Sequence, residues 1–181
     1  MALKNLHDFF KIICMHNVGE LVAQLQLVTH PEGGWYKETY RSEEIINHLS
    51  LPIRFGGNRA YSTAIYFLLP AGVFSAFHRI QSDECWHFYE GLPLNIHVIH
   101  KDGTLELIRL GRDLKNGETF QAVVPAGSWF ASIPEGAEGH TLAGCTVAPG
   151  FDFADFELAE AEELSMEFPQ HEALIRELCR I

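Results

Sequence analysis

We predict the fold from one segment, Gly72-Val73-Phe74-Ser75-Ala76-Phe77-His78-Arg79-Ile80-Gln81-Ser82-Asp83-Glu84-Cys85-Trp86-His87-Phe88-Tyr89-Glu90-Gly91. It begins and ends with a glycine, and between them His78 stands six residues before Glu84. Side chains alternate between the two faces of a β-strand, so His78 shares a face with Ile80, and Glu84 shares one with Trp86 and Phe88. A histidine and a glutamate at this spacing suggest half of a metal site.

The sequence on both sides of this segment reads as short strands separated by tight turns. Asp102-Gly103 and Asn116-Gly117 are strong turn signals. The predicted strands cover residues 35–41, 60–69, 73–79, 84–89, 94–100, 105–110, 119–124, 128–133 and 141–147. Many short strands without crossover helices between them predict a mainly β protein built as an antiparallel sandwich or barrel.

Helical patterns are confined to the two ends of the chain. The N-terminal segment, about 4–29, includes a predicted capping box in which Asn17 caps a helix and Glu20 follows three positions later. The β-barrel is expected at about 35–156 and two C-terminal helices at about 159–180. We therefore expect one domain over residues 1–181, with its helices packed outside the barrel.

Composition and charge exclude several kinds of partner. The 181 residues carry a formal net charge of −11, which argues against nucleic acid and anionic membrane surfaces. No apolar run approaches the roughly 20 residues of a membrane span, and the start lacks a secretory pattern. The four cysteines are scattered, as expected for buried, reduced thiols. A cytoplasmic protein is the simplest prediction.

The segment from Gly72 to Gly91 resembles the first motif of the cupin superfamily, Gly-x5-His-x-His-x3-4-Glu-x6-Gly, except that Ile80 replaces the second histidine. Pro125-Ala126-Gly127 resembles the centre of the second motif, but Phe130 stands where its histidine belongs. Residues 30–36, 77–89 and 144–153 are similar to one uncharacterised cupin branch. The resemblance implies an RmlC-like jelly roll, a double-stranded β-helix, and a homodimer.

The resemblance also implies where a metal would bind. A cupin metal site needs three or four ligands, and only His78 and Glu84 remain at the motif positions. Two ligands rarely hold a divalent ion, so a native metal is disfavoured. If one is present, we expect His97 to join His78 and Glu84 as a ligand.

A barrel interior with these replacements would be aromatic, and it predicts a pocket for a sugar, a base or another flat ring. The side chains expected to line it are Tyr36, Glu38, Tyr40, Ile80, Trp86, Phe88, His97 and Phe130. Small barrels can also fill themselves with side chains, so a closed core is the alternative.

Three functions remain open at this point. The first is a metal-free epimerase or isomerase acting on a sugar-like or carbonyl substrate, with His78 as base, Glu84 setting its tautomer and a tyrosine such as Tyr66 as acid. The second is a cupin that binds a small molecule without turnover. The third is a metal-dependent enzyme with rearranged ligands. Whether the protein is an enzyme is not decided by its sequence.

Overall fold

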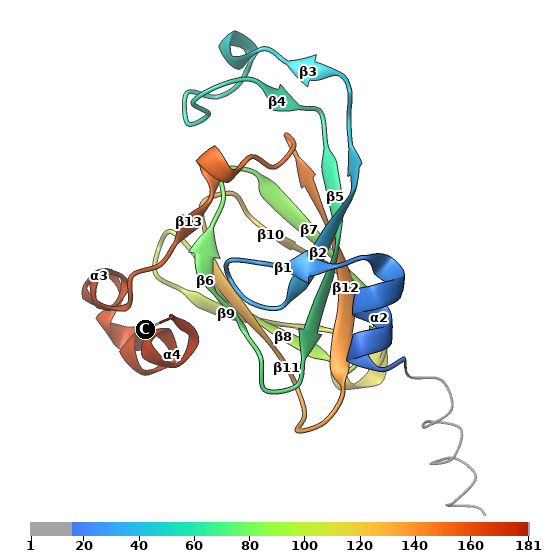
Figure 1. The fold of residues 1–181 in the computed structure, drawn as a ribbon. Coiled ribbons are helices and arrows are strands. Elements are labelled where there is room, and N and C mark those ends of the chain that lie inside the picture. Colours follow the sequence, from blue (N-terminus) through green and yellow to red (C-terminus); the bar gives the residue numbers. More distant parts are fainter. Residues whose placement is uncertain (1–15, 181) are drawn as a thin grey trace, which may run out of the picture.

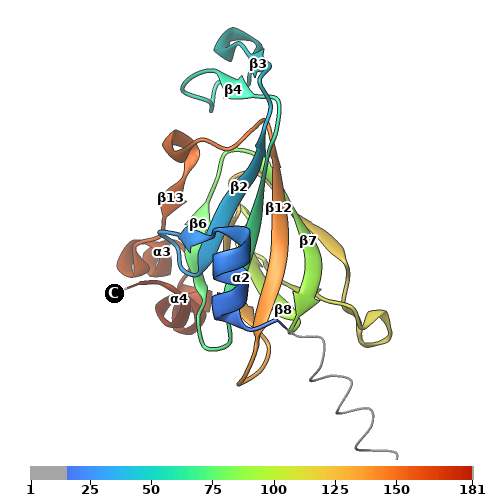
Figure 2. The same cartoon turned by 45° about the vertical axis from the view of Figure 1, so that its right-hand side comes forward.

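Two antiparallel β-sheets make up most of the computed structural model, which describes residues 16–180 (Figures 1 and 2). The six-stranded sheet has the order β1 (Val28–Thr29), β2 (Trp35–Arg41), β5 (Thr63–Pro70), β12 (His140–Ala148), β7 (Asp83–Gly91), β10 (Gln121–Val124). The five-stranded sheet has the order β13 (Glu157–Leu158), β6 (Ser75–Arg79), β11 (Trp129–Pro134), β8 (Leu94–Ile99), β9 (Leu105–Leu110). This arrangement confirms the predicted mainly β jelly roll.

The apolar core lies between the two sheets. Phe67 on β5 and Trp86 on β7 join Ile96, Val98 and Phe130 of the facing sheet in one buried cluster. The rings of Phe67 and Trp86 meet edge to face, with centroids 5.7 Å apart. Full burial of one such side chain contributes about 1.5–3 kcal/mol, so this cluster is the main attraction between the sheets.

Short helices cover the outer faces of both sheets. Helix α2 (Val18–Leu25) packs on the six-stranded sheet, and its predicted capping box is present, with Asn17 Oδ1 accepting from the Glu20 amide at 2.9 Å. Helices α3 (Ala161–Glu167) and α4 (Glu172–Leu178) pack on the five-stranded sheet (Figure 1). The predicted helical residues 4–15 lie outside the described part of the chain. Within residues 16–180, no helix is long and apolar enough to cross a membrane.

An arm formed by residues 42–62 extends beyond one end of the two sheets (Figures 1 and 2). It contains β3 (Ile45–Ile46), the 3-10 helix η1 (His48–Ser50) and β4 (Arg59–Ala60). A buried ion pair anchors its base, because Arg59 Nε donates to Asp155 Oδ2 at 2.6 Å. The remaining 3-10 helices are η2 (Leu114–Asn116), η3 (Phe153–Asp155) and η4 (Pro169–His171).

The glycines of the segment from Gly72 to Gly91 have a backbone role. Gly72 precedes β6 with φ 78°, and Gly91 ends β7 with φ 97°. Residues with a side chain rarely adopt such positive φ values, and a Cβ at Gly91 would also collide with the carbonyl oxygen of His140. The glycines therefore set the turns that bring β6 and β7 to their places.

A β-bulge in β2 decides which of its side chains face inward. Glu38 pairs with Ile65 of β5, but Tyr40 pairs with Ala64, so Thr39 is an extra residue. A bulge of this kind reverses the alternation of side chains beyond it. Glu38 and Arg41 consequently lie on the inner side, whereas Tyr40 is 53% exposed.

Candidate functional site

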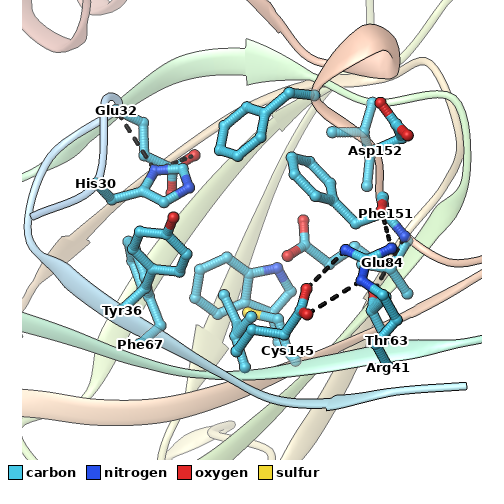
Figure 3. Close-up of a pocket in the computed structure, with 16 residues that line it drawn as sticks. His30, Glu32, Tyr36, Arg41, Thr63, Phe67, Glu84, Cys145, Phe151 and Asp152 are labelled. Atoms are coloured by element: carbon cyan, nitrogen blue, oxygen red, sulfur yellow. Dashed lines mark hydrogen bonds and ion pairs between the residues drawn. The ribbon is translucent and has the colours of Figure 1, made fainter. Parts of the chain in front are cut away.

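A cavity of about 410 Å³ opens against the inner face of the six-stranded sheet (Figure 3). Its wall is largely aromatic, with Tyr36, Phe67, Trp86, Phe151 and Phe153. Its ionisable lining residues are His30, Glu32, Glu38, Arg41, Glu84, Cys145 and Asp152. Such a combination of apolar walls and a few polar groups is typical of small-molecule sites, whose volumes are about 300–1,000 Å³.

Strand alternation and register place the residues at the sheet side of this cavity. Glu84 and Trp86 are two positions apart on β7 and point to the same face. Val147 and Cys145 of β12 are their direct partners in the antiparallel ladder. These four side chains therefore form one contiguous patch of the wall.

Glu84 is the most reactive group of this patch. It is only 8% exposed, and burial raises its pKa from 4.5 to about 7, although a hydrogen bond with Cys145 acts in the opposite direction. Near neutral pH the carboxyl therefore exchanges readily between its ionised and its protonated form, as a general acid or base must. Cys145 is itself fully buried, and burial raises the pKa of its thiol well above the usual value, so it is not a nucleophile.

Trp86 carries an unpaired donor at the same wall. The side chain is 1% exposed, and its Nε1–H has no hydrogen-bond partner among residues 16–180. A buried donor without a partner costs about 1–3 kcal/mol. Glu84 and Trp86 thus both line the cavity, one with a carboxyl group and the other with an indole whose N–H is buried and unpaired within this part of the chain.

A second ionisable group comes from the loop between β1 and β2. Glu32 is 5% exposed and accepts a hydrogen bond from Ser75 Oγ at 2.9 Å. Burial, reinforced by the charge of Glu84, raises its pKa well above the usual value. His78 Nε2 lies 3.1 Å from Glu32 Oε2, and burial lowers the pKa of this histidine to about 3. Glu32 and His78 are thus a neutral pair, in which Glu32 lines the cavity and His78 lies behind it.

The tautomer of His78 follows from its other ring nitrogen. Nδ1 lies 2.7 Å from the carbonyl oxygen of Ala76, so Nδ1 carries the proton and donates it there. The ring also packs against Phe130, with centroids 4.0 Å apart, and is 3% exposed. His30, which does line the cavity, is likewise neutral, because burial lowers its pKa to about 4.

An ion pair lies at the mouth of the cavity. Arg41 Nε and Nη2 donate to the two carboxylate oxygens of Glu38, at 3.0 and 2.6 Å. Arg41 Nη1 donates to the carbonyl oxygen of Phe151 at 3.1 Å (Figure 3). The pair therefore ties β2 to the segment that follows β12, across the entrance.

Comparison with known proteins identifies the family. Residues 19–159 match the family model described as cupin superfamily DUF985. The chain belongs to the cupin superfamily. This cupin is 34% identical over 154 residues to the uncharacterised protein YML079W of Saccharomyces cerevisiae, with 80% of this chain and 76% of that protein covered.

Two solved structures resemble this cupin over nearly its whole length. Protein SO0799 from Shewanella oneidensis is 41% identical, with a TM-score of 0.82, covering 92% of this chain and 99% of that one. A hypothetical protein from Leishmania major is 35% identical, with a TM-score of 0.84, covering 92% of this chain and 100% of that one. The names of these three relatives state no activity, so the site is interpreted from its own geometry.

The side chains of this cupin do not fit a divalent metal ion. Ile80 and Phe130 occupy two motif positions and have no donor atom. His97, the expected third ligand, faces Glu177 of helix α4 on the outside of the five-stranded sheet. In residues 16–180, no group of three or more His, Cys, Asp or Glu side chains is arranged to hold a metal. That the cupin works without a metal stays a prediction.

Five of the residues singled out from the sequence line the cavity of this cupin: Tyr36, Glu38, Ile80, Glu84 and Trp86. They share a simple origin, because alternation within a regular stretch of strand, or just beyond it, points them inward.

The other predicted residues lie elsewhere. Phe88 and Phe130 pack in the core, and the bulge in β2 turns Tyr40 outward. Tyr66 lies on the outer face of the six-stranded sheet, with its ring 5.9 Å from that of Tyr89 and close to helix α2. His78 does not pair with Glu84, contrary to the prediction, since Glu32 lies beside its ring.

Sequence reasoning missed the loop residues of the site. His30 and Glu32 belong to a turn without periodicity. Their one signal in the sequence was that they lie within residues 30–36, a stretch similar to one cupin branch. Phe151 and Phe153 follow β12 in an irregular segment, where alternation says nothing about direction. The inward direction of Cys145 was predictable, because alternation along β12 places it on the same face as Val147.

Proposed function

We propose that this cupin binds a small, ring-bearing carbonyl compound in the cavity and transfers a proton at the carbon next to the carbonyl group. Glu84 is the base of this reaction. The observation that carries the proposal is a buried carboxyl with a pKa of about 7 in an aromatic cavity, beside the unpaired Nε1–H of Trp86.

The two groups divide the chemistry between them. The Glu84 carboxylate takes the proton from carbon, and the electron pair of the C–H bond moves into the carbonyl group to give an enolate. Trp86 Nε1–H donates to the oxygen on which the charge develops, and such a donor lowers the barrier most in a site without water. Return of a proton from Glu84 to the same face of the carbon restores the substrate, with exchange wherever the Glu84 proton has first been replaced from solvent. An epimerisation also requires a proton from solvent on the opposite face of the enolate.

His78 has a supporting place in this proposal. Its Nε2 is covered by Glu32 and its Nδ1–H is donated to Ala76, so neither nitrogen is free for a ligand. Glu84 therefore replaces His78 as the proposed base. Tyr36 is the tyrosine whose side chain lines the cavity, whereas Tyr66 lies behind the sheet.

Proton exchange with solvent tests the proposal whichever product is formed. Cyclic ketones and neutral sugars with a free carbonyl group are incubated with protein in D2O, and loss of the C–H signal is followed by NMR. We expect exchange with the wild-type protein and at least about a 100-fold slower rate with Glu84→Gln, which cannot accept a proton. Glu163→Gln, an exposed carboxyl on α3, is the matched control.

The alternative function is binding without turnover. It uses the same aromatic wall and the same Trp86 donor, but it needs no titrating group. A ketone that changes the tryptophan fluorescence on binding, yet shows no exchange, would favour this alternative. Exchange that continues unchanged in Glu84→Gln would show that Glu84 is not the base.

A further inference from the structure

The charges around the cavity are strongly one-sided. Four carboxyl groups line it: those of Glu38, Glu84 and Asp152, and that of the neutral Glu32. The one cationic side chain among the lining residues is Arg41. The whole chain adds to this imbalance, since its formal net charge is −11.

The positive charge of Arg41 is already balanced. Its Nε and Nη2 donate to both oxygens of Glu38, and its Nη1 donates to the carbonyl oxygen of Phe151. A bidentate pair of this kind holds the planar guanidinium in place. A phosphate or carboxylate that reached the remaining N–H groups of Arg41 would lie close to the Glu38 carboxylate, whose charge repels it.

A negative group deeper in the cavity would also oppose the chemistry. It would lie near Glu84 and favour the protonated form of that carboxyl, because like charges in a poorly solvated site repel. Glu84 could then no longer take a proton. An anionic ligand is thus disfavoured both at the mouth and at the inner wall.

We infer that the cavity selects an uncharged cyclic carbonyl compound over phosphorylated, nucleotide-linked and carboxylate-bearing ones. The inference rests on the proposed function for the carbonyl group, but the selection against anions follows from the lining residues alone.

Two ligands of similar shape test the inference: cyclohexanone and 4-oxocyclohexanecarboxylate. Their affinities are measured by tryptophan fluorescence and by NMR titration up to about 10 mM, a range that covers weak binding. We expect the neutral ketone to bind and the carboxylate to bind about 100-fold more weakly. Tighter binding of the carboxylate, or no binding of the ketone, overturns the inference.

A variant at the mouth makes the test specific. Glu38→Gln removes the partner charge of Arg41 and frees its guanidinium. The ratio of carboxylate affinity to ketone affinity should then rise by at least about 10-fold, because an anion can pair with Arg41. An unchanged ratio would refute the argument about Arg41. Glu163→Gln is again the control.

Binding and exchange keep the two proposals apart. A charge preference measured in Glu84→Gln does not depend on proton transfer, so it can be present when exchange is absent. In that case the proposed enzyme reaction fails and the selection by charge stands. Exchange that is faster with the carboxylate than with the ketone would instead support the proposed reaction and contradict the selection by charge.

Discussion

Replacing Glu84 by glutamine should make the protein more stable at alkaline pH. Burial raises the pKa of this carboxyl from 4.5 to about 7. A change of this size between the unfolded and the folded state corresponds to about 3 kcal/mol. That is a large share of the stability of a typical domain, which is about 5–15 kcal/mol.

The sign follows from where the proton is bound. Between pH 4.5 and about 7 the folded protein keeps a proton on Glu84 that the unfolded chain has lost. Raising the pH through this range therefore favours unfolding. The cost is absent below 4.5 and complete above about 7, where the folded protein holds a buried charge. Glu84→Gln has no such cost at any pH.

Urea unfolding of both proteins at about pH 5 and about pH 8 measures this effect. The stability of the variant relative to the wild type should increase by about 2–3 kcal/mol between the two pH values. Comparing the two proteins cancels the titration of groups on which Glu84 does not act, including His30. Glu163→Gln should show no such change. If the relative stability of Glu84→Gln is the same at both pH values, the pKa of Glu84 is not raised by burial. The physical argument that Glu84 acts as the base would then fail.

Four further predictions concern the rest of the molecule. Glu32→Gln should lower the free energy of unfolding by less than about 1 kcal/mol because the native carboxyl is already neutral, whereas Glu32→Ala should lower it by about 3 kcal/mol or more. An equal loss of stability in both variants would contradict the neutral state of Glu32. Gly72→Ala should cost about 1–2 kcal/mol for its backbone conformation alone, and Gly91→Ala should cost clearly more because a carbonyl oxygen blocks the added Cβ. The His78 ring should show a neutral Nδ1–H tautomer in 15N NMR down to about pH 5, because its pKa is lowered; titration near its usual pKa would disprove this. We also propose a homodimer that uses the arm. Ile53→Asp, at a fully exposed apolar position of the arm, should give a monomer in light scattering, and a monomeric wild type would exclude the dimer.

The fold was predictable because its information is local and periodic. The predicted strand 105–110 coincides with β9, and the predicted strand 84–89 lies within β7 (Asp83–Gly91). Gly72 and Gly91 begin and end the motif, and both have a positive φ. A glycine at each position therefore reports a backbone requirement that can be seen in the sequence itself. The strand predicted at residues 60–69 was less accurate, since β4 of the arm ends at Ala60 and β5 begins only at Thr63.

The site was predictable only where it lies on regular strand. Glu84 and Trp86 were found by alternation on β7. Tyr40 was misplaced because a single extra residue in β2 reverses the alternation, and nothing in the local sequence announces it. The partner of His78 was missed because Glu32 comes from a loop, and contacts between a loop and a distant strand leave no periodic signal.

The bulge in β2 has a consequence for the entrance of the cavity. The strand pairs normally with β5 on both sides of the extra residue, so the ladder does not depend on it. If Thr39 instead paired with Ala64 and the ladder continued without a bulge, Tyr40 would lie opposite Thr63. Tyr40 would then point inward and Arg41 outward. The accommodation of one residue as a bulge therefore separates an entrance lined by an ion pair from one lined by an aromatic ring, while the core of the jelly roll stays the same.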